Sequence, residues 1–239
     1  MQVSTKAIVL SKLRYKDNDL IVKCYTENFG LKSYLVRNAF NSKKGKLKAA
    51  YFQLFTVLNI EADHKNNRSL HFFKEVHVYK PFKTLHTHIL KSTVVLFLAE
   101  ILGMALKEEE KNTPLFNFFL TAIFWFDSNE KAGSFHLVFL VKITKYLGFY
   151  PDNTNNTLPY FNLEDGSFEA TKNGPYSIGG STLNNFKVIL GTKFDSVVKI
   201  MLSPNEKEAV LNMILVYFKL HLYGFKQPKS LPILNQVFS

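Results

Sequence analysis

The sequence predicts an α+β protein, in which a five-stranded barrel at the N-terminus is followed by an all-α C-terminal domain. Two patterns support this class. In the first 80 residues, short segments alternate apolar and polar residues, as half-buried strands do. From residue 84 onward, apolar residues recur every three or four positions, as on the buried face of a helix. Pro81 marks the change, so we expect two domains, at residues 1–81 and 82–239.

The N-terminal part predicts five strands, over residues 7–10, 20–26, 31–37, 53–62 and 70–79. Gly30 closes the turn between the second and third strands, because glycine adopts a positive φ at little steric cost. In the third strand, Lys32 and Tyr34 alternate with Leu31, Ser33 and Leu35 and are expected together on the opposite face. Five short antiparallel strands in sequence favour a small closed barrel, with the OB-fold as the leading candidate.

The C-terminal part predicts helices over residues 84–102, 134–147, 182–190, 206–222 and 229–238, with another that opens at Thr113 as N-cap. Gly148 is a stop signal for the third of these helices along the chain. Ser203 and Glu206 have the spacing of a capping box. Residues 152–181 are rich in Asn, Gly, Pro, Ser and Thr, so we expect an irregular insert with room for one hairpin.

The positive charge is concentrated in the N-terminal third. The formal net charge of the 239 residues is +11. Residues 1–80 carry 15 Lys and Arg against six Asp and Glu, whereas the remaining residues carry 15 against 13. A positive field of this kind attracts nucleic acid or an anionic membrane surface.

Cysteine usage and hydropathy indicate the compartment. Cys24 is the single cysteine, so neither a disulfide framework nor a cysteine-ligated zinc site can form, which suits a reducing cytoplasm. The first six residues are polar and no apolar segment as long as that of a signal peptide follows them, so no signal peptide is expected. The apolar segments 94–106 and 115–126 are shorter than the roughly 20 residues that cross a bilayer, so we expect core helices.

Residue patterns typical of catalysis are missing from the sequence. It contains no Walker-type phosphate loop, no dinucleotide fingerprint, no nucleophile elbow and no carboxylate pair with catalytic spacing. Seven histidines lack the grouped partners of a metal site, and we expect His136 and His221 to be core or boundary residues. We therefore predict a protein that is not an enzyme and needs no cofactor or metal.

The segment 38–49, NAFNSKKGKLKA, is the strongest functional signal, because four lysines lie within six positions around Gly45. Cations that follow a phosphate backbone and aromatic rings on which bases stack are how OB-folds hold a single strand. For any one lysine or tyrosine, a solvated loop or a half-buried strand position is the simpler interpretation, so the signal is collective. The predicted DNA-binding residues are Arg14, Lys16, Lys32, Tyr34, Arg37, Phe40, Lys43, Lys44, Lys46, Lys48 and Tyr51.

Short motifs along the chain resemble the RecO family of recombination mediators and DNA repair proteins. In the N-terminal part, these motifs are Ala7-Ile8-Val9-Leu10, Leu20-Ile21-Val22, Tyr25-Thr26-Glu27 with Gly30, Val36-Arg37, Ser42-Lys43-Lys44 with Leu47-Lys48, and Phe52-Gln53-Leu54-Phe55. The helical part is similar to the family more loosely, in Gly148-Phe149-Tyr150-Pro151, in residues 161–168 and in Lys229-Ser230-Leu231.

The resemblance implies an N-terminal OB-fold followed by a helical domain. It implies binding of single- and double-stranded DNA and annealing of complementary strands. It also implies partnership with RecR and the single-strand-binding protein SSB, which together help to load RecA onto SSB-coated DNA. No nucleotide hydrolysis is implied.

The chain departs from many family members in two places. A four-cysteine zinc module of those members matches residues 152–181, where this chain has no cysteine, so we expect a metal-free insert. Arginines that help to receive the acidic SSB tail in some members are also missing. The predicted substitutes on the helix 134–147 are an apolar row with two cations: Phe135, Phe139, Ile143, Lys142 and Lys145. The simpler interpretation of the same spacing is that the three apolar residues are core and the two lysines are solvated.

Two other functions fit parts of the same sequence. A protein-interaction adaptor would use the helical domain and leave the basic loop solvated. A membrane-surface protein would be attracted by charge alone. Salt-dependent binding to an oligonucleotide distinguishes the DNA-binding protein from the adaptor, and binding to anionic liposomes tests the membrane alternative.

Overall fold

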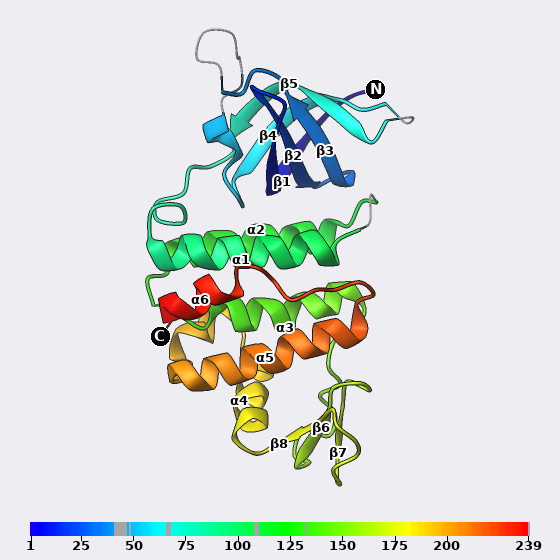
Figure 1. Cartoon of the computed structure of the whole chain (residues 1–239), viewed down its shortest axis with the longest axis vertical. Coiled ribbons are helices and arrows are strands. Elements are labelled where there is room, and N and C mark those ends of the chain that lie inside the picture. The colour runs from blue at the N-terminus through cyan, green and yellow to red at the C-terminus, as the bar shows by residue number, and fades with distance from the viewer. Residues whose placement is uncertain (41–46, 48, 66–67, 108–109, 132, 239) are drawn as a thin grey trace. The chain divides into compact units, whose positions relative to one another are not determined.

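A computed structural model describes all residues except 41–46, 48, 66–67, 108–109, 132 and 239 (Figure 1). The chain divides into two compact units, Met1–Ser128 and Asn129–Ser239, each of which is described by itself. The first unit holds two helices in addition to the barrel. The domain boundary expected after residue 81 stays a prediction, namely that residues 1–81 and 82–239 fold independently.

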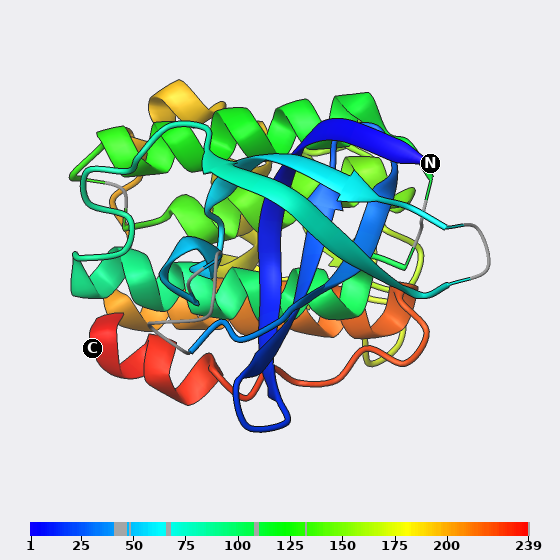
Figure 2. The same cartoon turned by 90° about the horizontal axis from the view of Figure 1, so that it is seen from above.

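The first unit is built on a closed barrel with the strand order β1-β2-β3-β5-β4, which confirms the predicted fold class. The strands are β1 (Gln2–Tyr15), β2 (Asp19–Thr26), β3 (Gly30–Val36), β4 (Val57–Asp63) and β5 (Leu70–Val78). All neighbours are antiparallel except β3 and β5, which are parallel. Figure 2 shows the β1–β2 turn, in dark blue, projecting beyond the other strands of the barrel.

The strand β1 is much longer than the predicted segment 7–10, because two partners use its two ends. Residues from Gln2 to Ile8 pair with β4, and residues from Ala7 to Tyr15 pair with β2. The register with β2 shifts between Val9 and Ser11, which lets the strand bend from one partner to the other. A strand that bends in this way alternates only locally, so its full length is not visible as one pattern.

The barrel core is formed by inward side chains from each strand, with the turn of 3-10 helix η1 (Ala49–Phe52) closing one side. Cys24 is fully buried there, and burial raises the pKa of its thiol above the usual range, so the thiol stays protonated and inert. Gly30 has φ 61°, which confirms the turn predicted between β2 and β3.

Two helices complete the first unit, α1 (Ile89–Ala105) and α2 (Thr113–Ser128). α2 begins one residue earlier than predicted from Thr113 as N-cap. Asn112 is the cap instead, since its Oδ1 accepts a hydrogen bond from Leu115 N at 3.0 Å. Tyr25 of β2 packs against α2, with its ring centroid 5.4 Å from that of Phe119.

The segment between β5 and α1, residues 79–88, is named the strap here. Asp127 of α2 holds it, because the carboxylate accepts hydrogen bonds from Lys83 N, Thr84 N and Leu85 N at 3.0, 2.8 and 2.9 Å. Burial alone would raise the pKa of Asp127, but these backbone donors and the Thr84 hydroxyl hold that pKa below its usual value. The strap therefore stays non-helical, and α1 starts at Ile89 rather than at residue 84.

The second unit packs helices against a small sheet. Its elements are α3 (Phe135–Leu147), β6 (Tyr160–Asn162), β7 (Ser167–Glu169), β8 (Ser177–Gly179), α4 (Gly180–Gly191), the 3-10 helix η2 (Phe194–Lys199), α5 (Pro204–His221) and α6 (Leu231–Phe238). Gly148 ends α3 with φ 85°, and Ser203 and Glu206 form the capping box of α5, as predicted.

The segment expected to be an irregular insert forms a three-stranded antiparallel sheet in the order β7-β6-β8. The β6–β7 hairpin uses Gly166 at φ 67° in its turn. Each strand has only three residues, too few for alternation to be recognised in the sequence. Throughout the described part of the chain, no helix is both long and apolar enough to cross a membrane.

Candidate nucleic-acid interface

Basic and aromatic side chains meet at the β1–β2 turn, at one end of the barrel. Arg14 holds the turn, since its Nη2 donates to Asp17 O at 2.8 Å. Lys16 adopts φ 53°, which directs the chain sharply back into β2. Asp19 Oδ1 accepts a hydrogen bond from Asn38 N at 2.9 Å, so the segment after β3 is fixed beside this turn.

Three described cations at this end, Arg14, Lys16 and Arg37, lie over aromatic rings. The Arg14 guanidinium is 5.1 Å from the ring centroid of Phe40, and Lys16 Nζ is 5.4 Å from that of Tyr15. Arg37 lies 5.1 Å from the Phe72 ring. Phe40 and Tyr15 are 45% and 40% exposed, so ring faces and cations are both available to a ligand. We call Arg14, Tyr15, Lys16, Arg37 and Phe40 the tip cluster.

The predicted lysines Lys43, Lys44, Lys46 and Lys48 lie outside the described residues. The residues on either side of them are described and lie together, because Ala49 N donates to Ala39 O at 3.2 Å. Tyr51, 39% exposed, follows in η1. The chain therefore enters and leaves the lysine-rich segment beside Phe40 of the tip cluster.

Two predicted residues of β3 do not join the tip cluster. Tyr34 is fully buried in the barrel, where its hydroxyl hydrogen-bonds His64 Nε2 at 2.9 Å, so the expectation that it stacks on a base is wrong. Tyr34 therefore points into the barrel rather than to the predicted outer face of β3. His64 makes this possible, because it supplies a hydrogen-bond partner for the tyrosine hydroxyl inside the core. Lys32 lies toward the opposite end of β3, where its charge acts on His64.

Two buried histidines, His64 and His71, lie beside Tyr34. The ring centroids of His64 and His71 are 4.5 Å apart, and burial, the adjacent His71 and nearby cations lower the pKa of His64 to about 4. No group of three or more His, Cys, Asp or Glu residues could hold a metal ion anywhere in the described ranges.

The predicted receptor for an acidic tail on α3 is wrong in its apolar part. Phe135, Phe139 and Ile143 are all buried in the core of the second unit, so they offer no open slot. Lys142 Nζ donates to Leu190 O at 3.1 Å, and burial and the neighbouring Lys145 lower its pKa. The i, i+4, i+8 spacing that suggested a slot is the same spacing that a core-facing helix shows.

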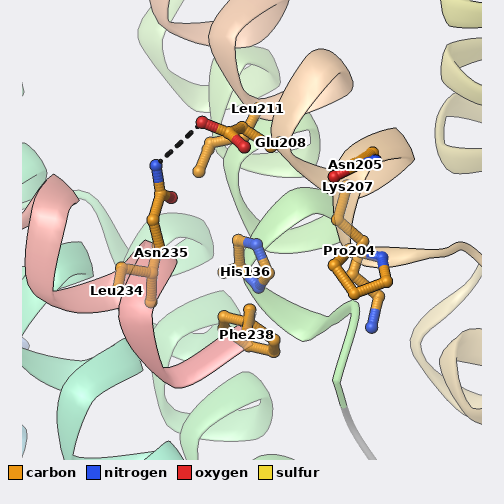
Figure 3. Close-up of a pocket in the computed structure, with 9 residues that line it drawn as sticks. All are labelled: His136, Pro204, Asn205, Lys207, Glu208, Leu211, Leu234, Asn235 and Phe238. Carbon is orange, nitrogen blue, oxygen red and sulfur yellow. Dashed lines mark hydrogen bonds between the residues drawn. The ribbon is translucent and has the colours of Figure 1, made fainter.

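A small cavity of about 80 Å³ lies beside the same helix, between His136 and the start of α5 (Figure 3). His136 is buried as expected, but its Nδ1 has no hydrogen-bond partner, and burial followed by the charge of Lys207 lowers its pKa to about 3. Phe238 of α6 packs over the imidazole, with 4.8 Å between ring centroids. On the α5 side, Glu208 Oε1 accepts a hydrogen bond from Asn235 Nδ2 at 3.1 Å.

Comparison with known proteins matches both parts of the chain to one family. The model of the recombination protein O N-terminal domain matches residues 1–82, and the model of its C-terminal domain matches residues 86–232. The DNA repair protein RecO of Flavobacterium johnsoniae is 46% identical over the full length of both chains. The RecO proteins of Christiangramia forsetii and Bacteroides fragilis are 42% and 33% identical, also over full length. The chain therefore belongs to the RecO family of DNA repair proteins.

Proposed function

We propose that this protein acts in DNA repair by binding DNA through the basic and aromatic end of its barrel. The tip cluster is the observation that carries the proposal, since it combines exposed rings with cations in the way that OB-folds use to hold single strands. Nothing in this arrangement reads base edges, so binding is expected to be independent of sequence.

The same surface suits both single- and double-stranded DNA, because phosphates supply most of the binding free energy in either case. We propose that the protein uses it to anneal complementary strands and, with RecR, to help load RecA onto SSB-coated single strands. The proposed role is non-catalytic, needs no cofactor and is carried out in the cytoplasm. Family membership supports these roles.

Binding of the SSB tail rests on the family resemblance. The described residues of α3 supply a cation for it in Lys145, which is exposed, but no apolar slot. The cavity of Figure 3 is already covered by the chain's own Phe238. We therefore propose that the tail binds the helical unit at a surface other than the apolar row of α3.

A strand-annealing assay on complementary oligonucleotides coated with SSB tests the proposal. The wild-type protein should accelerate annealing, and the double variant Lys16→Glu, Arg37→Glu should anneal slowly while keeping its thermal stability. A matched control is Lys193→Glu, Lys199→Glu, two exposed lysines of the second unit with the same change of charge. Equal annealing by the tip variant and the control would contradict a role for the tip cluster.

A further inference from the structure

The strap carries a second group of cations and aromatic rings that the sequence patterns did not reveal. Lys6 Nζ lies 5.2 Å from the ring centroid of Tyr79, and Lys80 Nζ lies 5.3 Å from that of Phe124. Phe82 joins them, with its ring centroid 5.1 Å from the Phe124 ring. These five residues are named the strap cluster.

The strap cluster is fixed in place and accessible. Tyr79 N donates to Val57 O at 2.8 Å, and the hydrogen bonds to Asp127 hold the following residues. Tyr79 is nevertheless 43% exposed, and Lys80 is exposed. Phe82 and Phe124 are partly buried, whereas Tyr79 leaves much of its side chain open to solvent next to the exposed Lys80.

A hollow connects the strap with the surface near the tip cluster. His86 extends the aromatic row, at 5.6 Å from Phe82, and also lines an open hollow of about 460 Å³. Lys12, Ala49 and Gln53 line the same hollow. Ala49 is where the chain returns from the lysine-rich segment, and Lys12 precedes Arg14 on β1. Figure 2 shows η1 and the strap on the same side of the barrel.

The two clusters lie toward opposite ends of β1. Lys6 and Arg14 are eight residues apart along this bent strand, a contour length of roughly 27 Å at 3.4 Å per residue. Between them, Ile8 and Leu10 are buried, and α1 packs along the strand, so the open route runs past Lys12 and His86. Cations and rings recur along this route from one end to the other.

We propose that one polynucleotide strand follows this route, from the tip cluster through the hollow to the strap cluster. The inference rests on the proposed DNA-binding function and extends it to a site beyond the barrel face. The strand is attracted by Lys12 and Lys80, and its bases stack on Tyr79 and in the hollow beside His86. Lys6 is half-buried and already pairs with Glu27 Oε1 at 3.7 Å, so it holds Tyr79 in place rather than binding a phosphate. The occupant is single-stranded nucleic acid, because only unpaired bases expose the faces that half-exposed rings can cover.

Three double variants of the full-length protein test the route, and each removes one exposed tyrosine and reverses one lysine. The strap variant is Tyr79→Ala, Lys80→Glu, and the tip variant is Tyr15→Ala, Lys16→Glu. The control is Tyr223→Ala, Lys226→Glu in the second unit, where Tyr223 is 95% exposed. Equal charge changes keep the net charge of the protein the same in all three, and the strap and tip variants both lie in the first unit.

Fluorescence anisotropy is measured with labelled oligothymidylates of about 4 to 16 nucleotides, the range of known OB-fold site sizes. Wild-type affinity should rise with length over this range. In the strap variant the rise should stop at a shorter length, with affinity for the longest probe reduced by about 5- to 150-fold, as expected when one base no longer stacks. The control should follow the wild type, and Tyr79→Trp should restore the rise.

The outcomes separate this inference from the proposed function. A strap variant that follows the wild-type curve overturns the route, and so does an equal loss at every length, since that loss would come from the tip or the fold. The tip variant could bind with wild-type affinity while the affinity of the strap variant stops rising at a shorter oligonucleotide length. In that case the proposed role of the tip cluster fails, and the strap cluster alone remains as a binding site. Wild-type protein that binds no oligonucleotide at low salt overturns both.

Discussion

At the scale of single residues, Tyr15 and Tyr34 show how two tyrosines of one barrel take different roles. Tyr34→Phe removes the hydroxyl that hydrogen-bonds His64 in the core, so the free energy of unfolding should fall by about 1–3 kcal/mol. Oligonucleotide affinity of the folded protein should not change. Tyr15→Ala should do the reverse, weakening binding with little effect on stability. Urea denaturation and anisotropy on both variants check this, and weaker DNA binding by Tyr34→Phe would contradict it.

The buried histidines predict a loss of stability in mild acid. The pKa of His64 is about 4 and that of His136 about 3, both below the 6.5 of the unfolded chain. Between these values the unfolded state binds more protons than the folded state, so the free energy of unfolding falls as pH decreases from 6.5 toward 4. Urea denaturation at pH 7 and pH 5 measures it, and His64→Gln should reduce the difference. A stability that is the same at both pH values would contradict the assignment.

At the scale of elements, the sequence predicts features that are local and misses those that depend on distant residues. Gly148 and the Ser203–Glu206 box were predictable, because a helix end is decided within a few neighbouring positions. The inward face of Tyr34 depends on His64, 30 residues away, and the delayed start of α1 depends on Asp127. The tip cluster was predictable only in part, since Arg14, Lys16, Arg37 and Phe40 were predicted from the sequence but the ring over which each cation lies was not.

The strap should detach when Asp127 loses its charge. Asp127→Asn keeps the shape of the side chain but weakens the acceptors for Lys83 N, Thr84 N and Leu85 N. Hydrogen bonds to a charged group contribute about 1.5–3 kcal/mol, so the free energy of unfolding should fall within that range. Asp17→Asn, at an exposed turn, is the matched control. Hydrogen exchange should increase at the strap amides, and protection equal to the wild type would refute the role of Asp127.

The sheet formed by β6, β7 and β8 should be stable without metal. The backbone ladder pairs all three strands, and Phe161 and Phe168 fill the space behind them with 4.9 Å between ring centroids. We expect elemental analysis of protein purified without added metal to find less than one zinc per chain, and chelator to leave the melting temperature unchanged. One zinc per chain, removed by chelator with a fall in melting temperature, would show that histidines and carboxylates replace the missing thiols.

At the scale of the whole molecule, the charge divides unequally between the two units. Residues 1–128 hold 19 Lys and Arg against 11 Asp and Glu, a net charge of +8, whereas residues 129–239 hold 11 against eight, a net charge of +3. The long-range attraction of a polyanion therefore acts mainly on the first unit, which also holds the tip and strap clusters. Removing charge from either unit should consequently have different effects on binding.

Replacing Lys43, Lys44, Lys46 and Lys48 together by alanine tests that difference. Each lysine that neutralises a phosphate releases a counterion, so the slope of log affinity against log salt should flatten by about 0.7 for each phosphate that is no longer neutralised. Binding to all sequences should weaken about equally, and the free energy of unfolding should change by less than about 0.5 kcal/mol per substitution, as is usual for surface residues. The matched control replaces four exposed lysines of the second unit, Lys172, Lys193, Lys199 and Lys226. If both quadruple variants showed the wild-type slope, the lysine-rich segment would not bind phosphates, and DNA binding would depend on the tip and strap clusters alone.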